Sequence, residues 1–161
     1  MAVPCARYFI TAVSEKRREG LACFRVWAKL LELASLNEAD VWGMVLMPDH
    51  FHALFVLPDT NTPSDVVRAL KGPATPTLRD LGLAWQRNYF EHRLRSVEES
   101  EPYLRYMLAN PYRAGIADIG VRWPFWSVIS PNARWFIEKF PKQIPEPEWL
   151  DIEQPWETYG S

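Results

Sequence analysis

Two apolar segments, separated only by Pro48-Asp49, constrain the fold of this chain more than any other feature. Val41–Met47 is a nearly continuous apolar run, and His50–Leu57 carries apolar side chains on both of its alternating faces. A strand that is apolar on both faces lies in the interior of a sheet. Because the connection between them is short, we expect the two strands to be adjacent and antiparallel.

The segments around this pair predict a split βαβ arrangement. Arg7–Val13 is rich in β-forming residues and predicts a first strand, and Leu21–Ala34 has the apolar spacing of an amphipathic helix. A second helix is expected from a cap at Thr62 or Ser64 to about Gly72. The further expected elements are a turn-rich stretch over 72–77, a strand over 85–95, and a helix from Ser100 to about Ala109 that Pro111 ends. This order predicts an α+β, ferredoxin-like fold, an antiparallel sheet with helices packed on one face.

The length of 161 residues predicts one domain with a substantial core. We expect this domain to occupy residues 1–130 and a Pro-rich, acidic extension to occupy residues 131–161. No apolar run reaches the length of a membrane span, and the first residues lack a signal-peptide pattern. Cys5 and Cys23 lack metal-ligand spacing, so we interpret them as reduced thiols of a cytoplasmic protein without membrane contact.

The net charge of −2 hides an uneven distribution along the chain. Residues 66–113 carry eight basic and five acidic groups, whereas residues 138–161 carry two basic and six acidic groups. The main part of the chain is therefore mildly basic and the end is acidic. This distribution permits a phosphate-bearing partner without requiring one.

His50 and His52 stand two apart on the expected third strand. Side chains at that spacing point to the same face of a sheet, so the two imidazoles form half of a metal site, and Phe51 faces the opposite, buried side. Taken alone, the pair is equally compatible with histidines that satisfy hydrogen bonds at a turn. A cupin-like metal site is the other alternative, but it expects a glutamate where this chain has Leu54 to Leu57.

Tyr106 and Asn110 lie four residues apart on the expected helix, about 6 Å along its axis, and share one helix face. If this helix packs over the histidine face, the amide oxygen completes a site for Mg²⁺ or Mn²⁺, and Tyr106 becomes a nucleophile for a phosphodiester. Two other tyrosines compete for this role. Tyr103 is seven residues from Asn110 and is expected to pack or contact DNA, and Tyr112 is expected to leave the helix after the proline.

Several motifs in consistent order resemble the REP-associated tyrosine transposases, which belong to the single-tyrosine, HUH-type transposase superfamily. The resemblance covers roughly residues 7–130. It is carried by the His50-Phe51-His52 pair, by Trp85-Gln86-Arg87 with Glu91-His92, by the segment Tyr106 to Gly115, and by Trp123-Pro124 followed by Trp126-Ser127. The histidine pair alone is a weak signal, whereas the ordered combination is specific.

The resemblance implies that His50, His52 and Asn110 bind a divalent metal, Mg²⁺ or Mn²⁺, and that Tyr106 is the catalytic residue. It implies cleavage and transfer of single-stranded DNA through a 5′-phosphotyrosine intermediate, at hairpins of repetitive extragenic palindromes. The protein would act on this hairpin DNA as a monomer or a homodimer. The low overall charge and the acidic end depart from the more basic family pattern, which bears on DNA affinity and its salt dependence.

Six further residues are candidate DNA contacts: Arg68, Lys71, Trp85, Arg87, His92 and Arg95. Two other functions stay open. The first is a domesticated hairpin-DNA-binding protein without significant turnover. The second is hydrolysis of a small phosphoester at the same metal site.

Overall fold

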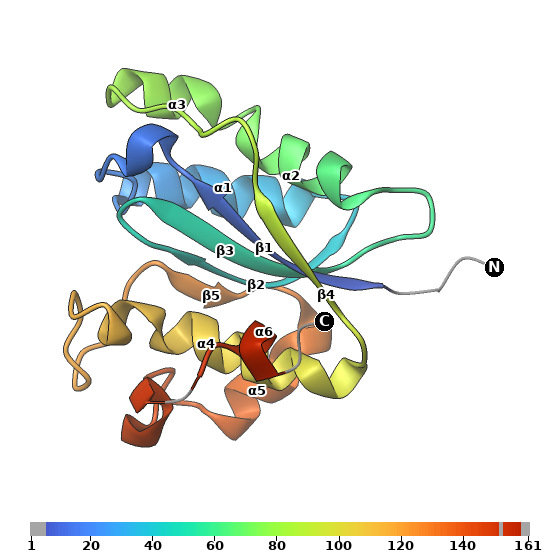
Figure 1. The fold of residues 1–161 in the computed structure, drawn as a ribbon, viewed down its shortest axis with the longest axis vertical. Coiled ribbons are helices and arrows are strands. Elements are labelled where there is room, and N and C mark those ends of the chain that lie inside the picture. The colour runs from blue at the N-terminus through green and yellow to red at the C-terminus, as the bar shows by residue number, and fades with distance from the viewer. Residues whose placement is uncertain (1–5, 152, 159–161) are drawn as a thin grey trace.

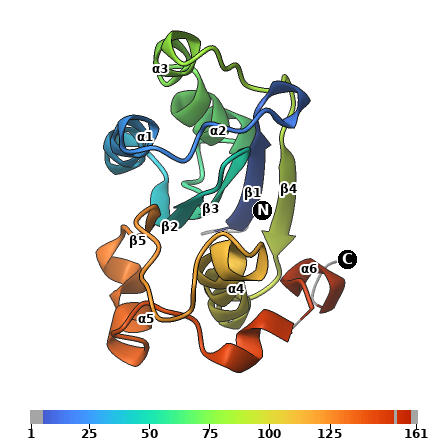
Figure 2. The same ribbon diagram turned by 90° about the vertical axis from the view of Figure 1, so that its left-hand side faces the viewer.

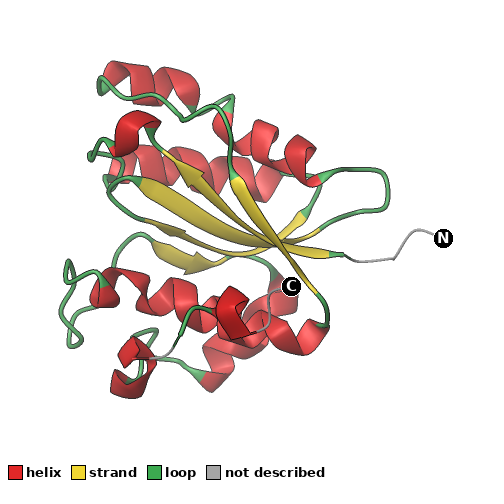
Figure 3. Ribbon diagram, viewed as in Figure 1, coloured by secondary structure: helices red, strands yellow, loops and turns green. Residues whose placement is uncertain are grey.

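The computed structural model describes residues 6–151 and 153–158 and contains one five-stranded sheet (Figures 1 and 3). Its strands are β1 (Arg7–Val13), β2 (Asp40–Leu46), β3 (His50–Val56), β4 (Phe90–Leu94) and β5 (Trp126–Val128). They stand in the order β4-β1-β3-β2-β5, and every neighbouring pair is antiparallel. The predicted α+β, ferredoxin-like sheet is therefore confirmed, with the two apolar segments adjacent.

Helices cover both faces of this sheet, whereas we expected them on one (Figure 2). One face packs against α1 (Phe24–Leu36), α2 (Pro63–Lys71) and α3 (Thr75–Asp80). The opposite face packs against α4 (Ser100–Arg113), α5 (Arg134–Lys139) and α6 (Pro155–Thr158). We call these the α1 face and the α4 face. The second layer follows from the strands, because both of their faces are apolar and both need cover.

The alternation along β3 sends its side chains to the two faces as predicted. Phe51 and Phe55 are fully buried in the core of the α1 face. His52 stacks on Phe9 of β1, and Leu54 joins the core of the α4 face. Phe51 is thus the buried residue that separates two imidazoles held on the other side of the sheet.

Helix α2 begins with a capping box at Thr62, one of the two predicted caps. The Thr62 hydroxyl accepts a hydrogen bond from the Asp65 N–H, and the Asp65 carboxylate accepts one from the Thr62 N–H. Pro63 occupies the first helical position, where its missing N–H costs nothing.

The region before α4 differs from the prediction in three respects. Helix α3 occupies part of the stretch expected to be turns only. Strand β4 begins at Phe90 rather than at Trp85. Trp85 lies outside the strand and forms an isolated β-bridge with Ser14. Strand β4 also lies at the edge of the sheet, so His92 is not on a central strand. Its exposed, charged neighbours Glu91 and Arg93 agree with an edge position.

Helix α4 runs through Pro111 to Arg113, four residues beyond the predicted end at Ala109. A proline removes only its own N–H from the hydrogen-bond ladder, and the next turn is closed by the Ala114 N–H, which donates to the Asn110 carbonyl. Tyr112 therefore stays in the helix. Its hydroxyl donates to the Val121 carbonyl at 2.6 Å and accepts from the Trp123 N–H at 2.9 Å, which fixes the following loop to the helix.

The C-terminal segment forms a 3₁₀ helix over Pro147–Asp151 and the short helix α6, and its Trp149 is buried. The Arg105 guanidinium of α4 lies over the rings of Trp149 and Phe140, at 4.9 and 5.2 Å from their centroids. This pairing fastens the segment to the outer side of α4.

Cys23 is a free thiol, and Cys5 lies outside the described residues. None of the helices in the described ranges combines the length and the apolar character that crossing a bilayer requires.

Candidate active site

His50 and His52 present their Nε2 atoms to each other on the α4 face, 3.2 Å apart. The other ring nitrogens are engaged, because His50 Nδ1 lies 2.7 Å from a carboxylate oxygen of Asp49 and His52 Nδ1 lies 2.8 Å from the Thr11 hydroxyl. A carboxylate accepts hydrogen bonds, so the proton of a neutral His50 belongs on Nδ1 and the Nε2 lone pair faces the site. Such second contacts set the orientation of metal-binding histidines.

Both imidazoles are kept neutral by burial. Burial lowers the pKa of His50, although its bond to the Asp49 carboxylate acts in the opposite direction. Burial and the neighbouring His50 lower the pKa of His52 well below its usual value. For Asp49, burial alone would raise the pKa, but His50 and Arg17 outweigh it and the net pKa is lowered. A neutral imidazole is the form that binds a metal.

Helix α4 brings Tyr106 and Asn110 over this pair, as the sequence predicted. The Tyr106 ring lies 5.7 Å from the His52 ring, and Asn110 is close enough to His50 to favour its protonated form. The Asn110 Oδ1 atom is nevertheless buried and accepts no well-formed hydrogen bond from the described residues. A buried acceptor without a donor is costly unless another group, such as a cation, meets it.

The donor set therefore fits a divalent ion. Among the described residues, no three histidine, cysteine, aspartate or glutamate side chains gather at a metal-binding distance, so a third ligand has to be of another type. The unsatisfied Oδ1 of Asn110 is an oxygen donor of such a type, on the helix that packs over the two imidazoles. Oxygen with imidazole ligands suits Mn²⁺ and, less strongly, Mg²⁺.

Tyr103 is the packing residue that we expected as one alternative. It is buried, its ring lies 5.0 Å from that of Phe9, and burial raises its pKa to about 12. Among the three tyrosines of α4, all within the described residues, the ring in contact with the histidine pair is that of Tyr106. Its ring is also covered by the Arg113 guanidinium at 5.3 Å, about two helix turns further on.

Two of the other predicted DNA contacts, Lys71 and Trp85, are engaged on the α1 face, away from the histidine pair. The Lys71 ammonium is held by the Gln86 and Asn88 carbonyls, and Trp85 packs on Phe51 of the α1 face. Three further candidates, Arg68, Arg87 and Arg95, are exposed. His92 and Tyr106 both contact one tryptophan of the C-terminal segment, Trp156.

Several contacts at the site were not predicted from the sequence. Thr11 is signalled by its alternation with Phe9 on β1, and Asp49 by its place beside His50. Nothing in the sequence signals that Trp156 lies 4.9 Å from the Tyr106 ring, because the contact depends on the path of the whole C-terminal segment.

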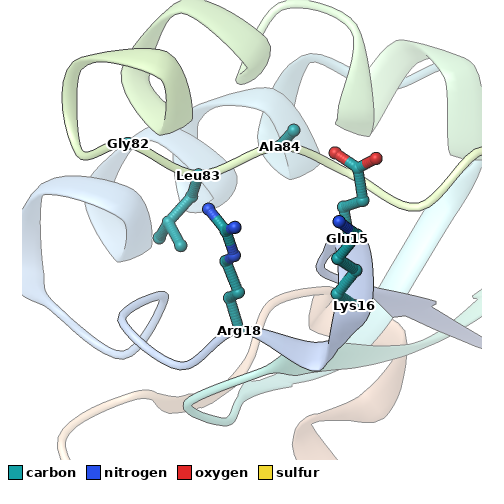
Figure 4. A pocket seen from close by; sticks show the side chains of 6 residues that line it. All are labelled: Glu15, Lys16, Arg18, Gly82, Leu83 and Ala84. Carbon is teal, nitrogen blue, oxygen red and sulfur yellow. The ribbon is translucent and has the colours of Figure 1, made fainter.

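A small pocket lies near the end of β1 and contains none of the predicted site residues (Figure 4). It is formed by the turn after β1 and the segment before β4, and its lining residues are Glu15, Lys16, Arg18, Gly82, Leu83 and Ala84. The candidate site is thus a surface between β3 and α4 rather than this pocket.

The five-stranded antiparallel sheet with helices agrees with the comparisons to known proteins. The family described as "Transposase IS200 like" matches residues 6–107. Because that match spans more than half of the chain, the protein belongs to the IS200-like transposase family.

Two curated relatives are REP-associated tyrosine transposases. One is a putative member from Haemophilus influenzae, 28% identical over 100 residues that cover 53% of this chain and 56% of the relative. The other is from Escherichia coli, 28% identical over 89 residues that cover 55% of this chain and 52% of the relative. The chain thus aligns with about half of the length of each.

The fold also matches a solved structure of a REP-associated tyrosine transposase bound to a REP hairpin. The TM-score is 0.67 at 18% sequence identity, with 95% of this chain and 88% of the other covered. At this identity the likeness establishes the fold, including the part of the chain beyond residue 107.

Proposed function

We propose that the protein is a metal-dependent, single-stranded DNA endonuclease and strand transferase that acts on hairpins of repetitive palindromes. The proposal is carried by the convergence of His50, His52, Asn110 and Tyr106 from β3 and α4 in a member of the IS200-like family. The curated relatives named REP-associated transposases support the choice of DNA.

In this proposal His50, His52 and Asn110 hold Mg²⁺ or Mn²⁺. When bound, the ion polarises the scissile phosphate and offsets charge that develops on it. The protein contributes two neutral imidazoles whose orientation is set by Asp49 and Thr11. These contacts leave the donor atoms in place before any metal arrives.

Tyr106 supplies the nucleophile. Its hydroxyl oxygen attacks the phosphorus and loses its proton, and the bond to the 3′ oxygen breaks, so that one strand ends in a free 3′ hydroxyl after protonation. The other strand stays attached through a 5′-phosphotyrosine bond. The phosphoester energy is conserved, and a 3′ hydroxyl can reverse the step on a second strand, which is strand transfer.

Among the candidate DNA contacts, His92 has the strongest structural support because it and Tyr106 both contact the Trp156 ring. Arg87 and Arg95 are exposed near the same edge strand, where guanidinium groups suit phosphates. Arg68, Lys71 and Trp85 remain weaker proposals, since Lys71 and Trp85 are engaged on the α1 face.

The direct test incubates the protein with Mn²⁺ and single-stranded hairpin DNA, then separates covalent adducts in denaturant. We expect Tyr106→Phe to abolish the adduct and Tyr103→Phe, the same change on the same helix, to retain it. An equal yield of adduct from Tyr106→Phe would overturn the assignment.

The same experiment distinguishes the hairpin-binding alternative, which the contact of Trp156 with Tyr106 favours. Tight, salt-sensitive hairpin binding by the wild type without any adduct would support a protein that binds but does not turn over. Turnover of a small diester without an adduct would instead indicate a phosphoesterase.

A further inference from the structure

Arg113 is the last residue of α4, and its guanidinium lies over the ring of Tyr106, 5.3 Å from the ring centroid. Asn110 and Arg113 follow Tyr106 by four and seven residues, so all three share one face of the helix. Helical side chains point toward the N-terminus of their helix, which brings Arg113 back along this face toward the tyrosine. A cation thus covers the side chain that we assign as the nucleophile.

The two arginines of α4 differ in what they contact. Arg105 forms an ion pair with Glu101 at 2.8 Å and covers the rings of Phe140 and Trp149. Arg113 is exposed, and among the described side chains no carboxylate forms an ion pair with it. Arg105 therefore serves the fold, whereas the charge of Arg113 is available to a ligand.

A basic residue in the last turn of a helix also complements the partial negative charge of the terminal carbonyls. That role is fulfilled anywhere near those carbonyls. It does not require the guanidinium of Arg113 to lie over the Tyr106 ring, about two turns back along the helix. The position of the guanidinium thus needs a further reason.

The groups already assigned to the site do not supply an anion for Arg113. The two imidazoles are neutral, Asn110 is an amide, and the Asp49 carboxylate contacts His50 and Arg17. The planar fork of a guanidinium matches two oxygens of a phosphate. Stacking on a phenol ring leaves the N–H groups of that fork free to donate in the plane of the guanidinium. A phosphodiester is therefore a suitable partner.

We propose that Arg113 is a catalytic residue that binds the scissile phosphate, with its guanidinium donating to the non-bridging oxygens of the phosphodiester that Tyr106 attacks. The inference rests on the proposed function and adds one group to that site. Because the ring and the hydroxyl of Tyr106 are one rigid group, a phosphate on Arg113 lies next to the attacking oxygen. Arg113 keeps its protons throughout, and its charge offsets the negative charge that grows on the phosphate oxygens.

The first measurement is binding of a hairpin oligonucleotide with single-stranded flanks, without metal so that no cleavage intervenes. One phosphate of the flanks at a time is replaced by an uncharged methylphosphonate. Four proteins are compared: wild type, Arg113→Ala, Arg113→Lys and Arg134→Ala. The last is a control, because Arg134 is an exposed arginine at the start of α5, on the same side of the sheet.

At one linkage the methylphosphonate should weaken wild-type binding by about tenfold, the size expected for a charge-assisted hydrogen bond. Arg113→Ala should bind the unmodified DNA about tenfold more weakly and lose its sensitivity to that linkage alone. Arg113→Lys should keep part of this sensitivity, since it retains the charge without the fork, and Arg134→Ala should behave as wild type. The same linkage profile in wild type and Arg113→Ala, or no binding by either, would overturn the proposal.

The second measurement is the rate of covalent adduct formation in Mn²⁺ at saturating DNA, where differences in binding no longer contribute. Arg113→Ala should slow the reaction by about 10²- to 10³-fold, as for the loss of other groups that stabilise charge in a transition state. The adduct should form at the linkage that the binding scan identifies. An unchanged rate would overturn the catalytic role. A fall in Mn²⁺ affinity of the same size as the fall in rate would also overturn it, because it would indicate a structural effect.

The two measurements keep this inference distinguishable from the proposed function. The expected linkage profile without an adduct from wild type upholds the contact of Arg113 with a phosphate and rejects the proposed chemistry. An adduct that wild type and Arg113→Ala form at the same rate upholds the chemistry and rejects the role of Arg113.

Discussion

The two faces of the sheet are built from the same strands but differ in composition. The α1 face is filled by aliphatic and aromatic side chains, among them Leu30, Met44 and Phe51. The α4 face has a core of similar extent, but it also holds His52, Tyr103 and Tyr106. Among the described residues, the buried core of the α1 face consists of apolar side chains, whereas the α4 face also holds polar ones between the sheet and a helix.

This difference shows how a small fold separates stability from chemistry. Because alternate residues of a strand face opposite sides, the histidines enter one layer without disturbing the other. The apolar α1 face supplies free energy of folding. The α4 face retains polar groups whose positions are fixed by neighbours, such as Thr11 for His52. The following substitutions separate the two contributions.

The largest expected effect is on the α1 face. Leu30 is fully buried on α1, and Leu30→Ala should lower the free energy of unfolding by about 2–5 kcal/mol through lost burial and a cavity. Urea denaturation measures the loss, and Leu36→Ala, at an exposed position of the same helix, should change it by about 0.5 kcal/mol or less. The affinity of the folded protein for Mn²⁺ should not change. A loss of stability as small as that of the control would contradict the assignment of stability to this face.

Alkaline pH should weaken the α4 face through Tyr103. Burial, followed by the nearby Glu99, raises its pKa from 10.0 to about 12. The folded state then keeps a proton that the unfolded state loses. Ionisation of Tyr103 therefore leaves the free energy of unfolding unchanged below pH 10.0 and lowers it as the pH rises toward 12. The loss amounts to at most about 3 kcal/mol at about 1.4 kcal/mol per pKa unit.

The measurement is the urea midpoint between neutral pH and the alkaline limit of reversible folding. Tyr103→Phe should show a shallower decline than wild type, because phenylalanine has no proton to lose. Parallel declines in the two proteins would show that the pKa of Tyr103 does not differ between the folded and unfolded states.

Thr11→Val should affect the metal rather than the fold. The change keeps the shape and the β-branching but removes the hydroxyl that contacts His52 Nδ1. If the proposed metal site is correct, Mn²⁺ affinity should fall by about 10- to 100-fold, as for other partners of metal-binding histidines. Electron paramagnetic resonance of free Mn²⁺ measures it. Thr60→Val, in an exposed loop, is the matched control, and equal affinities of both variants would reject this role for Thr11.

The central fold and most of the site were predictable because they depend on local patterns. Alternation located β3 and separated Phe51 from the histidines, and a cap at Thr62 marked the start of α2. The spacing of Tyr106 and Asn110 depends only on helix geometry.

The rest depended on contacts that local patterns do not describe. The continuation of α4 past Pro111 is supported by the loop that Tyr112 holds, and this tertiary contact outweighs the proline's preference. The edge position of β4 is a property of strand order. The contact of Trp156 with Tyr106 follows from how Arg105 fastens a distant segment, which no single-sequence period reveals.

The pairing of β1 with both β3 and β4 has a consequence for how the gene can vary. Strand β1 pairs Phe9 with His92 on β4 and Thr11 with His52 on β3. The number of residues between Phe9 and Thr11 therefore fixes the spacing of these two contacts. A deletion of one codon within β1 would turn Ile10 and Ala12 toward the wrong layer. Insertions between β3 and α2, in the exposed stretch at Asp59 and Thr60, leave the spacing of residues along β1 unchanged. Length variation among descendants of this gene should therefore accumulate in such loops and spare β1.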